Sequence, residues 1–387
     1  MIITKVLHRA KGKIVAQLKK PFFRPVIYNA NKSKAKQKRC LFLYITNPFR
    51  SNIVSEQHQN QWQAKEIARI IGEYGFIVDV ADYNNKDVKL RYKYDLIIGL
   101  IPRGIDIYSK HMNPGCVRIA YLTSMNLQFT SDAEEKRLND LANRRGTRLQ
   151  ARRFAGYIQK EIEEFDAAWY IGNSYNFHSY DCFKMPPTFY IKNSGYIFDW
   201  ATTSHSRSPQ NFLFFGSLGA VHKGLDLLLE IFSEEVRDCN LYVCGGYEGE
   251  KDFLDEYREE LYHSPNIFPI GFVDIESPKY RHLSEICAYT LLPSCAEGCA
   301  GSVLTNMSAG IIPIVSKECG FEDDEVINLP DCSKETIRDY IKAYSQKEHE
   351  WIENESRKAV EIVNKRYSKS SFTDSVVKAV AGSLAVK

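Results

Sequence analysis

One stretch of the sequence brings together an acidic side chain, several very small residues and the start of a helix. Residues 294–310 read SCAEGCAGSVLTNMSAG, and Glu297 stands between an alanine and a glycine. Such small residues let the backbone approach a ligand closely, and the first amides of a helix favour an anion. Two interpretations follow: a bound anion beside a carboxylate, or a tight turn that binds nothing.

A lysine is the second charged group whose position suggests chemistry. Lys223 lies in the stretch VHKGLD, between the apolar run NFLFFGS and a run with helical periodicity. An ammonium group at such a helix start either faces water or stabilises a developing negative charge. The acidic run EDDE at 322–325 has the composition of a solvated loop, and no Asp-x-Asp motif ends a predicted strand. These residues therefore predict no metal site.

Length and composition limit the class of protein. The chain has 387 residues, of which 44% are hydrophobic and 26% charged, and this suits two folded soluble domains. It has no run of about 18 apolar residues, so no transmembrane helix is expected, and its start lacks the pattern of a secretory signal. The ten cysteines include no Cys-x-x-Cys pair, which favours reduced thiols in the cytoplasm over a zinc site or disulfides.

The first 39 residues differ from the remainder in charge. They hold twelve Lys or Arg and no Asp or Glu, which leaves 39 basic and 48 acidic residues, a net charge of −9, for the rest. Apolar residues recur there at helical spacing, from Ile3 to Leu18. We interpret residues 1–39 as a basic amphipathic arm that contacts an anionic membrane surface. A solvated tail and a nucleic-acid contact are the alternatives, but no nucleic-acid-binding module is recognisable elsewhere.

Strand-like and helix-like segments alternate along the rest of the chain, which predicts parallel sheets covered by helices on both faces. The fold class is therefore α/β, with two Rossmann-like domains facing each other across a cleft. We expect an N-terminal domain at 40–200, a polar linker at 201–211, a C-terminal domain at 212–365, and a C-terminal helix at 366–387 that returns to the N-terminal domain. Ligands of such sheets bind at the carboxyl ends of the strands, where the Glu297 turn is expected.

The order of motifs resembles that of retaining, nucleotide-sugar-dependent glycosyltransferases with the GT-B fold, the family-4-like or group 1 enzymes. FFGSLGAVHKGLDLLLEIF resembles the Gly-Arg…Lys-Gly loop of that family. NIFPIGFV resembles its nucleotide-base strand, and LLPSCAEGCAGSVLTNMSAGIIPIVS its Glu-x7-Glu segment. The three motifs lie between residues 212 and 320, and the first half of the chain resembles the acceptor domain more loosely.

The resemblance implies roles for individual residues. Lys223 takes the position of the pyrophosphate lysine, and Glu297 that of the first glutamate, which contacts the donor sugar. The other donor-binding positions that it implies are Gly216, Ser217, Gly271, Phe272, Gly298, Cys299, Ala300, Gly301, Ser302 and Thr305. The small residues after Glu297 would make room for a phosphate at the amides of residues 299–302.

Three positions depart from the family pattern. The second glutamate of the Glu-x7-Glu segment is replaced by Thr305, which can hold a ribose hydroxyl through one group only. The loop arginine of the family aligns with Ser217. The first-domain histidine of the family falls near Met125, and His58 is the nearest candidate to replace it as a catalytic residue. A solvated loop histidine is the alternative for His58.

The resemblance predicts a glycosyltransferase of the hexosyltransferase type that moves a sugar from a nucleotide sugar to a glycan or lipid-linked glycan acceptor. It implies retention, polysaccharide biosynthesis, no cofactor and no metal, because Lys223 and helix dipoles would replace the metal. The location implied is the cytoplasm, including the inner face of the membrane. The alternatives are an inactive GT-B-like partner subunit, which Ser217 and Thr305 would favour, and a nucleotide-sugar epimerase.

Overall fold

The computed structural model describes residues 26–34, 38–50, 58–85, 88–99, 106–153, 160–201 and 207–386. The amphipathic helix expected near the start of the basic arm lies outside the described residues. Residues 26–34 pack on the first domain, where Ile27 forms an antiparallel bridge with Val80. The Asn29 amide also donates to the Asp79 carboxylate at 2.8 Å. Packing on this domain therefore extends N-terminal of residue 40.

The first domain contains a six-stranded parallel sheet in the order β2-β1-β3-β4-β5-β6. Its strands are β1 (Lys38–Tyr44), β2 (Phe76–Asp82), β3 (Tyr94–Gly99), β4 (Met112–Leu122), β5 (Ala167–Ile171) and β6 (Thr188–Ile191). Its helices include α2 (Asn60–Glu73), α3 (Leu127–Arg145) and α4 (Ser174–Phe177). Strands β2 and β5 are buried along their whole length, as parallel strands with both faces covered must be.

The second domain repeats this arrangement with the strand order β12-β11-β10-β7-β8-β9, again all parallel. Its strands are β7 (Ser208–Gly216), β8 (Asn240–Gly245), β9 (Ile267–Gly271), β10 (Cys287–Leu292), β11 (Ile312–Ser316) and β12 (Ile327–Leu329). Its helices include α5 (Leu225–Glu234), α6 (Lys251–Glu256), α7 (Arg258–His263), α8 (Pro278–Ile286), α9 (Gly301–Ser308) and α10 (Lys334–Tyr344). The predicted two-domain α/β fold is therefore confirmed.

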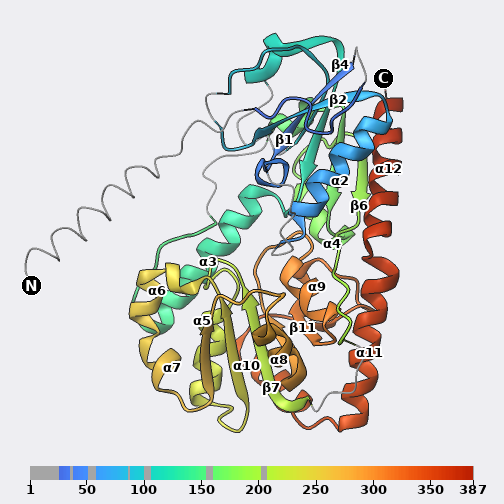
Figure 1. Ribbon diagram of the computed structural model, residues 1–387. Helices are drawn as coiled ribbons and strands as arrows, with labels where there is room; N and C mark the ends of the chain where they lie inside the picture. Colours follow the sequence, from blue (N-terminus) through green and yellow to red (C-terminus); the bar gives the residue numbers. More distant parts are fainter. Residues whose placement is uncertain are drawn as a thin grey trace, which may run out of the picture.

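Two long helices connect the domains at the end of the chain. Figure 1 shows α11 (His349–Arg366) beside the second domain and α12 (Lys369–Ala385) along the first. Helix α12 packs on β6 and α2. It is tied there by bonds from the Trp169 indole to Ser383 at 3.0 Å and from the Tyr74 hydroxyl to the Val377 carbonyl at 3.2 Å. The last helix of the chain thus covers the first sheet.

In two segments with helical periodicity, the described residues do not form one continuous helix. Residues 250–263 form two short helices, α6 and α7, with a break at Tyr257. The break buries the Tyr257 ring completely and lets its hydroxyl donate to Glu230 at 2.8 Å. In the region 150–165 only Lys160–Glu164 is described as helical, as a 3-10 turn. The amides of Arg152 and Arg153 bond to the Glu134 carboxylate instead of to a preceding turn.

Candidate functional site

A cavity of about 820 Å³ lies between the carboxyl ends of the two sheets. Its second-domain wall includes the residues that end β7 and β8, and its first-domain wall includes those that end β1, β3, β4 and β5. Of the residues predicted from sequence, this cavity is lined by His58, Gly216, Ser217, Lys223, Phe272, Glu297, Gly298, Cys299, Ala300, Gly301 and Ser302. Gly271 and Thr305 are not among its lining residues.

Lys223 and Glu297 form an ion pair inside this cavity. Lys223 ends the loop after β7, where its amide donates to the Gly219 carbonyl at 2.9 Å, and Gly224 has a φ of +74° that starts α5. Glu297 is held by a bond from its amide to the Glu318 carbonyl at 3.0 Å and by the Ser294 hydroxyl at 3.0 Å. The Lys223 side chain is 5% exposed and that of Glu297 19%. The pair therefore presents both a cation and an anion to a partly dehydrated space.

The surroundings of Glu297 keep it ionised. Burial alone would raise its pKa, but the charges of Lys223 and Arg153, joined at low pH by that of protonated His222, outweigh burial and lower the pKa to about 2. A carboxylate with that pKa carries its full negative charge at neutral pH. It can accept hydrogen bonds from sugar hydroxyls or stabilise a positive centre, but it cannot act as an acid.

His222, which the sequence analysis missed, is a buried support for this pair. Its Nε2 faces the Ala296 carbonyl at 2.7 Å, so Nε2 carries the proton, and its Nδ1 lies 3.3 Å from the Cys295 thiol. Burial is the largest influence on its pKa and lowers it to about 4, against the opposing charge of Glu297. A neutral His222 therefore holds the backbone of the Glu297 turn next to the Lys223 loop.

This buried histidine predicts a pH dependence of stability. Its folded pKa of about 4 lies below the usual 6.5, so the unfolded state binds more protons between these values. Stability should therefore fall as the pH drops from 6.5 to 4, by up to about 3 kcal/mol from this group. Urea unfolding at pH 7 and pH 4.5 should give a smaller loss for His222→Gln than for wild type. Asp226, whose pKa burial raises to about 6, has the opposite slope but contributes equally to both proteins. Equal losses would contradict the prediction.

The glycines after Glu297 lie against the first domain, and the backbone contact at Gly298 leaves no room for a side chain. A Cβ on Gly298 would lie 2.5 Å from the Thr123 carbonyl oxygen and 2.7 Å from that of Ile171. A Cβ on Gly301 would lie 2.8 Å from the Gln59 side-chain oxygen. The Ala300 amide donates to the Cys319 carbonyl at 2.9 Å and is therefore engaged within the protein. The small residues thus let the two domains approach each other, and the first-turn amides of α9 at Gly301 and Ser302 are the ones left for an anion.

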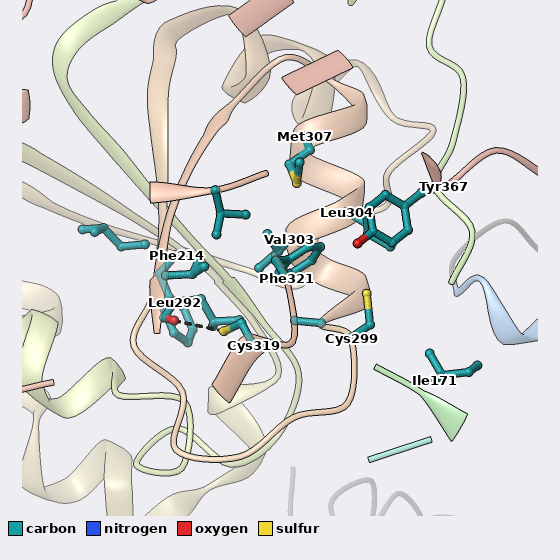
Figure 2. Packing of buried hydrophobic residues seen from close by; sticks show 14 of the residues in the cluster. Ile171, Phe214, Leu292, Cys299, Val303, Leu304, Met307, Cys319, Phe321 and Tyr367 are labelled. Carbon is teal, nitrogen blue, oxygen red and sulfur yellow. Dashed lines mark hydrogen bonds between the residues drawn. The ribbon is translucent and has the colours of Figure 1, made fainter. Parts of the chain in front are cut away.

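Helix α9 is held in place by its apolar face. Figure 2 shows Val303, Leu304 and Met307 along this helix, with Phe321 and Tyr367 packed against it. The Cys319 thiol bonds to the Leu292 carbonyl at 3.3 Å and ties the end of β10 to the segment that follows β11. The N-terminus of α9 is therefore fixed relative to Glu297.

Thr305 has a different environment from the one expected for a ribose contact. It is 4% exposed, and its hydroxyl donates to the Gly301 carbonyl at 2.9 Å. The same hydroxyl accepts a hydrogen bond from the Gln59 side chain of the first domain at 3.1 Å. Gln59 also donates to the Gly301 carbonyl at 2.8 Å. Thr305 therefore takes part in a contact between domains.

We expect Thr305→Val to reduce stability without weakening nucleotide binding. The change removes the Thr305 hydroxyl, which accepts a hydrogen bond from Gln59 and donates one to the Gly301 carbonyl. The loss of one net hydrogen bond costs about 0.5 to 1.5 kcal/mol. Urea unfolding measures that cost, and calorimetric titration with a nucleoside diphosphate measures the affinity. A fall in affinity of tenfold or more with unchanged stability would instead return Thr305 to the ribose role.

The remaining predicted residues occupy different parts of the cavity wall. The exposed Phe272 ring and the exposed Leu218 side chain are apolar parts of the wall, and Leu218 lies beside Gly246. His58 lies in the first-domain wall, where its Nδ1 accepts a bond from the Asn60 amide at 3.2 Å. That bond leaves the proton of a neutral His58 on Nε2.

Sequence analysis also missed two residues near the loop after β7. Glu250 accepts hydrogen bonds from the Gly219 and Ala220 amides at 2.6 and 3.1 Å, and Arg153 reaches the same loop from the first domain. The only signal for Arg153 was a pair of adjacent arginines, which is common on solvated helices.

No group of three or more His, Cys, Asp or Glu able to hold a metal occurs within the described residues. Among the described helices none is long and apolar enough to cross a membrane.

Comparisons with known proteins agree with this architecture. Residues 209–341 match the family model described as glycosyl transferases group 1. Sucrose-phosphate synthase from Thermosynechococcus elongatus is 12% identical, with a TM-score of 0.65 over 91% of this chain and 100% of its own. HepE from Anabaena, solved with UDP-glucose, is 14% identical, with a TM-score of 0.57 over 89% of this chain and 100% of its own.

S. aureus TarM is 13% identical to this chain, with a TM-score of 0.54. The match covers 74% of this chain and 54% of TarM, so the chain spans about half the length of TarM. No curated protein sequence matches this chain. The fold is thus the GT-B fold of glycosyltransferases. The predicted resemblance to group 1 glycosyltransferases is confirmed, and the matching segment is the one that contains Lys223 and Glu297.

Proposed function

We propose that this protein is a glycosyltransferase that moves a sugar from a nucleoside-diphosphate sugar to a glycan or lipid-linked glycan acceptor. The observation that carries the proposal is the Lys223–Glu297 ion pair in a cavity between two Rossmann-like domains. A departing diphosphate gains negative charge, which an ammonium group stabilises, and the sugar gains positive charge, which a carboxylate stabilises. The pair supplies one group of each kind in the same cavity.

The geometry suggests where each part of the donor would lie. Phe272 and Leu218 offer apolar surface for a nucleobase. The diphosphate would lie near Lys223 and the first amides of α9, where the helix N-terminus favours negative charge. The sugar would then reach Glu297, and the acceptor would enter along the first-domain wall, which includes the Tyr44, Tyr83 and Tyr180 side chains. Aromatic side chains of this kind commonly line the sites that bind ligands.

In the proposed reaction the bond between the anomeric carbon and the diphosphate oxygen breaks, and a bond from that carbon to the acceptor oxygen forms. Because Nδ1 of His58 already accepts the Asn60 amide, the acceptor proton would pass to the departing diphosphate, on the same face of the sugar. This is the reason for proposing retention. The residues present would need no metal for charge stabilisation. A role in polysaccharide biosynthesis and a membrane contact through residues 1–39 complete the proposal.

A panel of nucleotide sugars tests the proposal. A donor at 100 times its dissociation constant stabilises a protein by about 2.7 kcal/mol, which gives a clear rise in melting temperature. Donors that raise it would then be assayed for release of nucleoside diphosphate with glycan acceptors. Binding without turnover would favour an inactive partner subunit, and interconversion of the sugar without acceptor would favour an epimerase. Absence of binding to any donor would overturn the proposal.

A further inference from the structure

Arg153 reaches across the cavity from the first domain to the donor-side loop of the second. Its Nη2 donates to the Ser217 hydroxyl and to the Leu218 carbonyl, both at 3.0 Å. The side chain is exposed, and it lines the same cavity as Lys223 and Glu297. Its charge is near enough to Glu297 to contribute to the low pKa of that carboxyl group. A first-domain cation therefore lies beside the second-domain ion pair.

No carboxylate among the described residues neutralises the charge of Arg153. Both of its bonds go to uncharged oxygens, and within the described ranges no carboxylate forms an ion pair with it. The neighbouring arginine behaves differently, since Arg152 pairs with Asp252 and lies 3.5 Å from Glu250. A guanidinium with uncharged partners on the wall of a cavity is suited to an anionic ligand, because it presents a planar set of donors that matches phosphate oxygens.

The backbone of Arg153 is held firmly. The carboxylate of Glu134, which is 1% exposed on α3, accepts hydrogen bonds from the Arg152 amide at 2.9 Å and the Arg153 amide at 2.7 Å. Arg152 is attached in turn to the second domain through Asp252. The position from which the Arg153 side chain extends is therefore fixed by both domains, and little ordering is needed when a ligand binds.

Two backbone amides of the loop after β7 are already hydrogen-bonded within the protein, so they are not available to a phosphate. Glu250, which is 3% exposed, already accepts hydrogen bonds from the Gly219 amide at 2.6 Å and the Ala220 amide at 3.1 Å. A diphosphate at this loop must therefore be bound mainly by side chains and by α9. Lys223 is one such side chain, and Arg153 is a second cation that reaches the loop.

We propose that Arg153 binds the diphosphate of the donor together with Lys223, so that the diphosphate is bound by both domains at once. This inference rests on the proposed function, because it assumes a nucleoside-diphosphate donor in this cavity. On binding, the guanidinium exchanges its contacts with Ser217 and Leu218 for phosphate oxygens or shares them. Because Arg153 belongs to the first domain and Lys223 to the second, the affinity for the diphosphate would also depend on the relative position of the two domains.

Calorimetric titration of the full chain with UDP, GDP and ADP, and with the matching nucleosides, tests this role. For the diphosphate that binds wild type, we expect Arg153→Gln to weaken binding roughly 10- to 100-fold, because a charge-assisted hydrogen bond is lost. Arg153→Lys should recover only part of the affinity, since a lysine keeps the charge but not the planar set of donors. Affinity for the nucleoside should not change, because it has no phosphate.

A matched control separates this effect from a general loss of charge. Arg148→Gln removes the same charge five residues away, from an exposed side chain that bonds only to Asn139 and Glu135 among the described residues, and it should bind as wild type does. If Lys223→Met loses affinity while Arg153→Gln stays within twofold of wild type, the role of Arg153 is wrong and the proposed function stands. An equal loss of nucleoside and diphosphate affinity in Arg153→Gln also overturns this role. If wild type binds none of the three diphosphates, this inference is wrong, and the proposed function falls only if the panel of nucleotide sugars also shows no binding.

Discussion

Replacing Lys223 by methionine is expected to lower turnover by roughly 100- to 1000-fold, the range for loss of one preorganised group that stabilises developing charge. The Lys223 ammonium lies against Glu297 and is 5% exposed, so water cannot replace it easily. Methionine keeps most of the side-chain volume and so limits the effect on packing. The loss should appear in the rate with saturating donor, because the charge on the diphosphate grows as the bond to the sugar breaks.

Initial rates of nucleoside diphosphate release measure this effect, after circular dichroism has verified that the variant is folded. Lys251→Met is the matched control, because the Lys251 side chain is 86% exposed and, within the part of the chain that the structure describes, pairs only with Asp255 on the same helical surface. That variant should keep the wild-type rate. A Lys223→Met enzyme within threefold of wild type would show that this ammonium does not act on the reacting groups.

The fold was largely predictable because its strands are covered on both faces. Runs such as FIVDVAD, which is apolar apart from its two aspartates, and CAYTLL are buried at every position, and a mainly apolar run of this length bounded by polar loops predicts a parallel strand. The errors lie where a tertiary contact overrides local periodicity. Tyr257 interrupts a helical pattern to reach Glu230, and Glu134 binds the amides of Arg152 and Arg153 in a segment whose composition favours a helix.

The candidate site was predictable only in part, and the reason is sequence separation. The motif around Glu297 and the loop around Lys223 each carried a local signal, yet the ion pair joins residues 74 positions apart. The Gln59–Thr305 bond joins residues 246 positions apart. No local pattern reports such pairs. Sequence reasoning therefore explained the glycines at 298 and 301 by room for a phosphate, whereas the structure gives the contact with first-domain atoms as a sufficient cause.

The ion pair leads to a second large effect, because Glu297 and a bound diphosphate would compete for the same lysine. In the structure, the Lys223 ammonium bonds to Glu297. Glutamine at position 297 keeps the shape and can still accept the Ser294 hydroxyl, which now bonds to Glu297 at 3.0 Å. It lacks the negative charge that would stabilise the sugar as it becomes cation-like. Glu297→Gln should therefore lower turnover by roughly 100-fold or more, as expected for loss of one charge-stabilising group.

Binding of the diphosphate should change in the opposite direction. In wild type, Lys223 must give up its bond to the Glu297 carboxylate when the diphosphate binds, whereas in the variant it gives up only a bond to a neutral amide. A hydrogen bond to a charged group is stronger than one to a neutral group by about 1 kcal/mol. Glu297→Gln should therefore bind the nucleoside diphosphate as tightly as wild type or up to about tenfold more tightly. Rates at saturating donor and calorimetric titration of the same protein measure the two effects. A variant that keeps full turnover, or that loses affinity for the diphosphate more than threefold, would contradict this account, because a carboxylate that reads the sugar and restrains Lys223 must affect catalysis and binding in opposite ways.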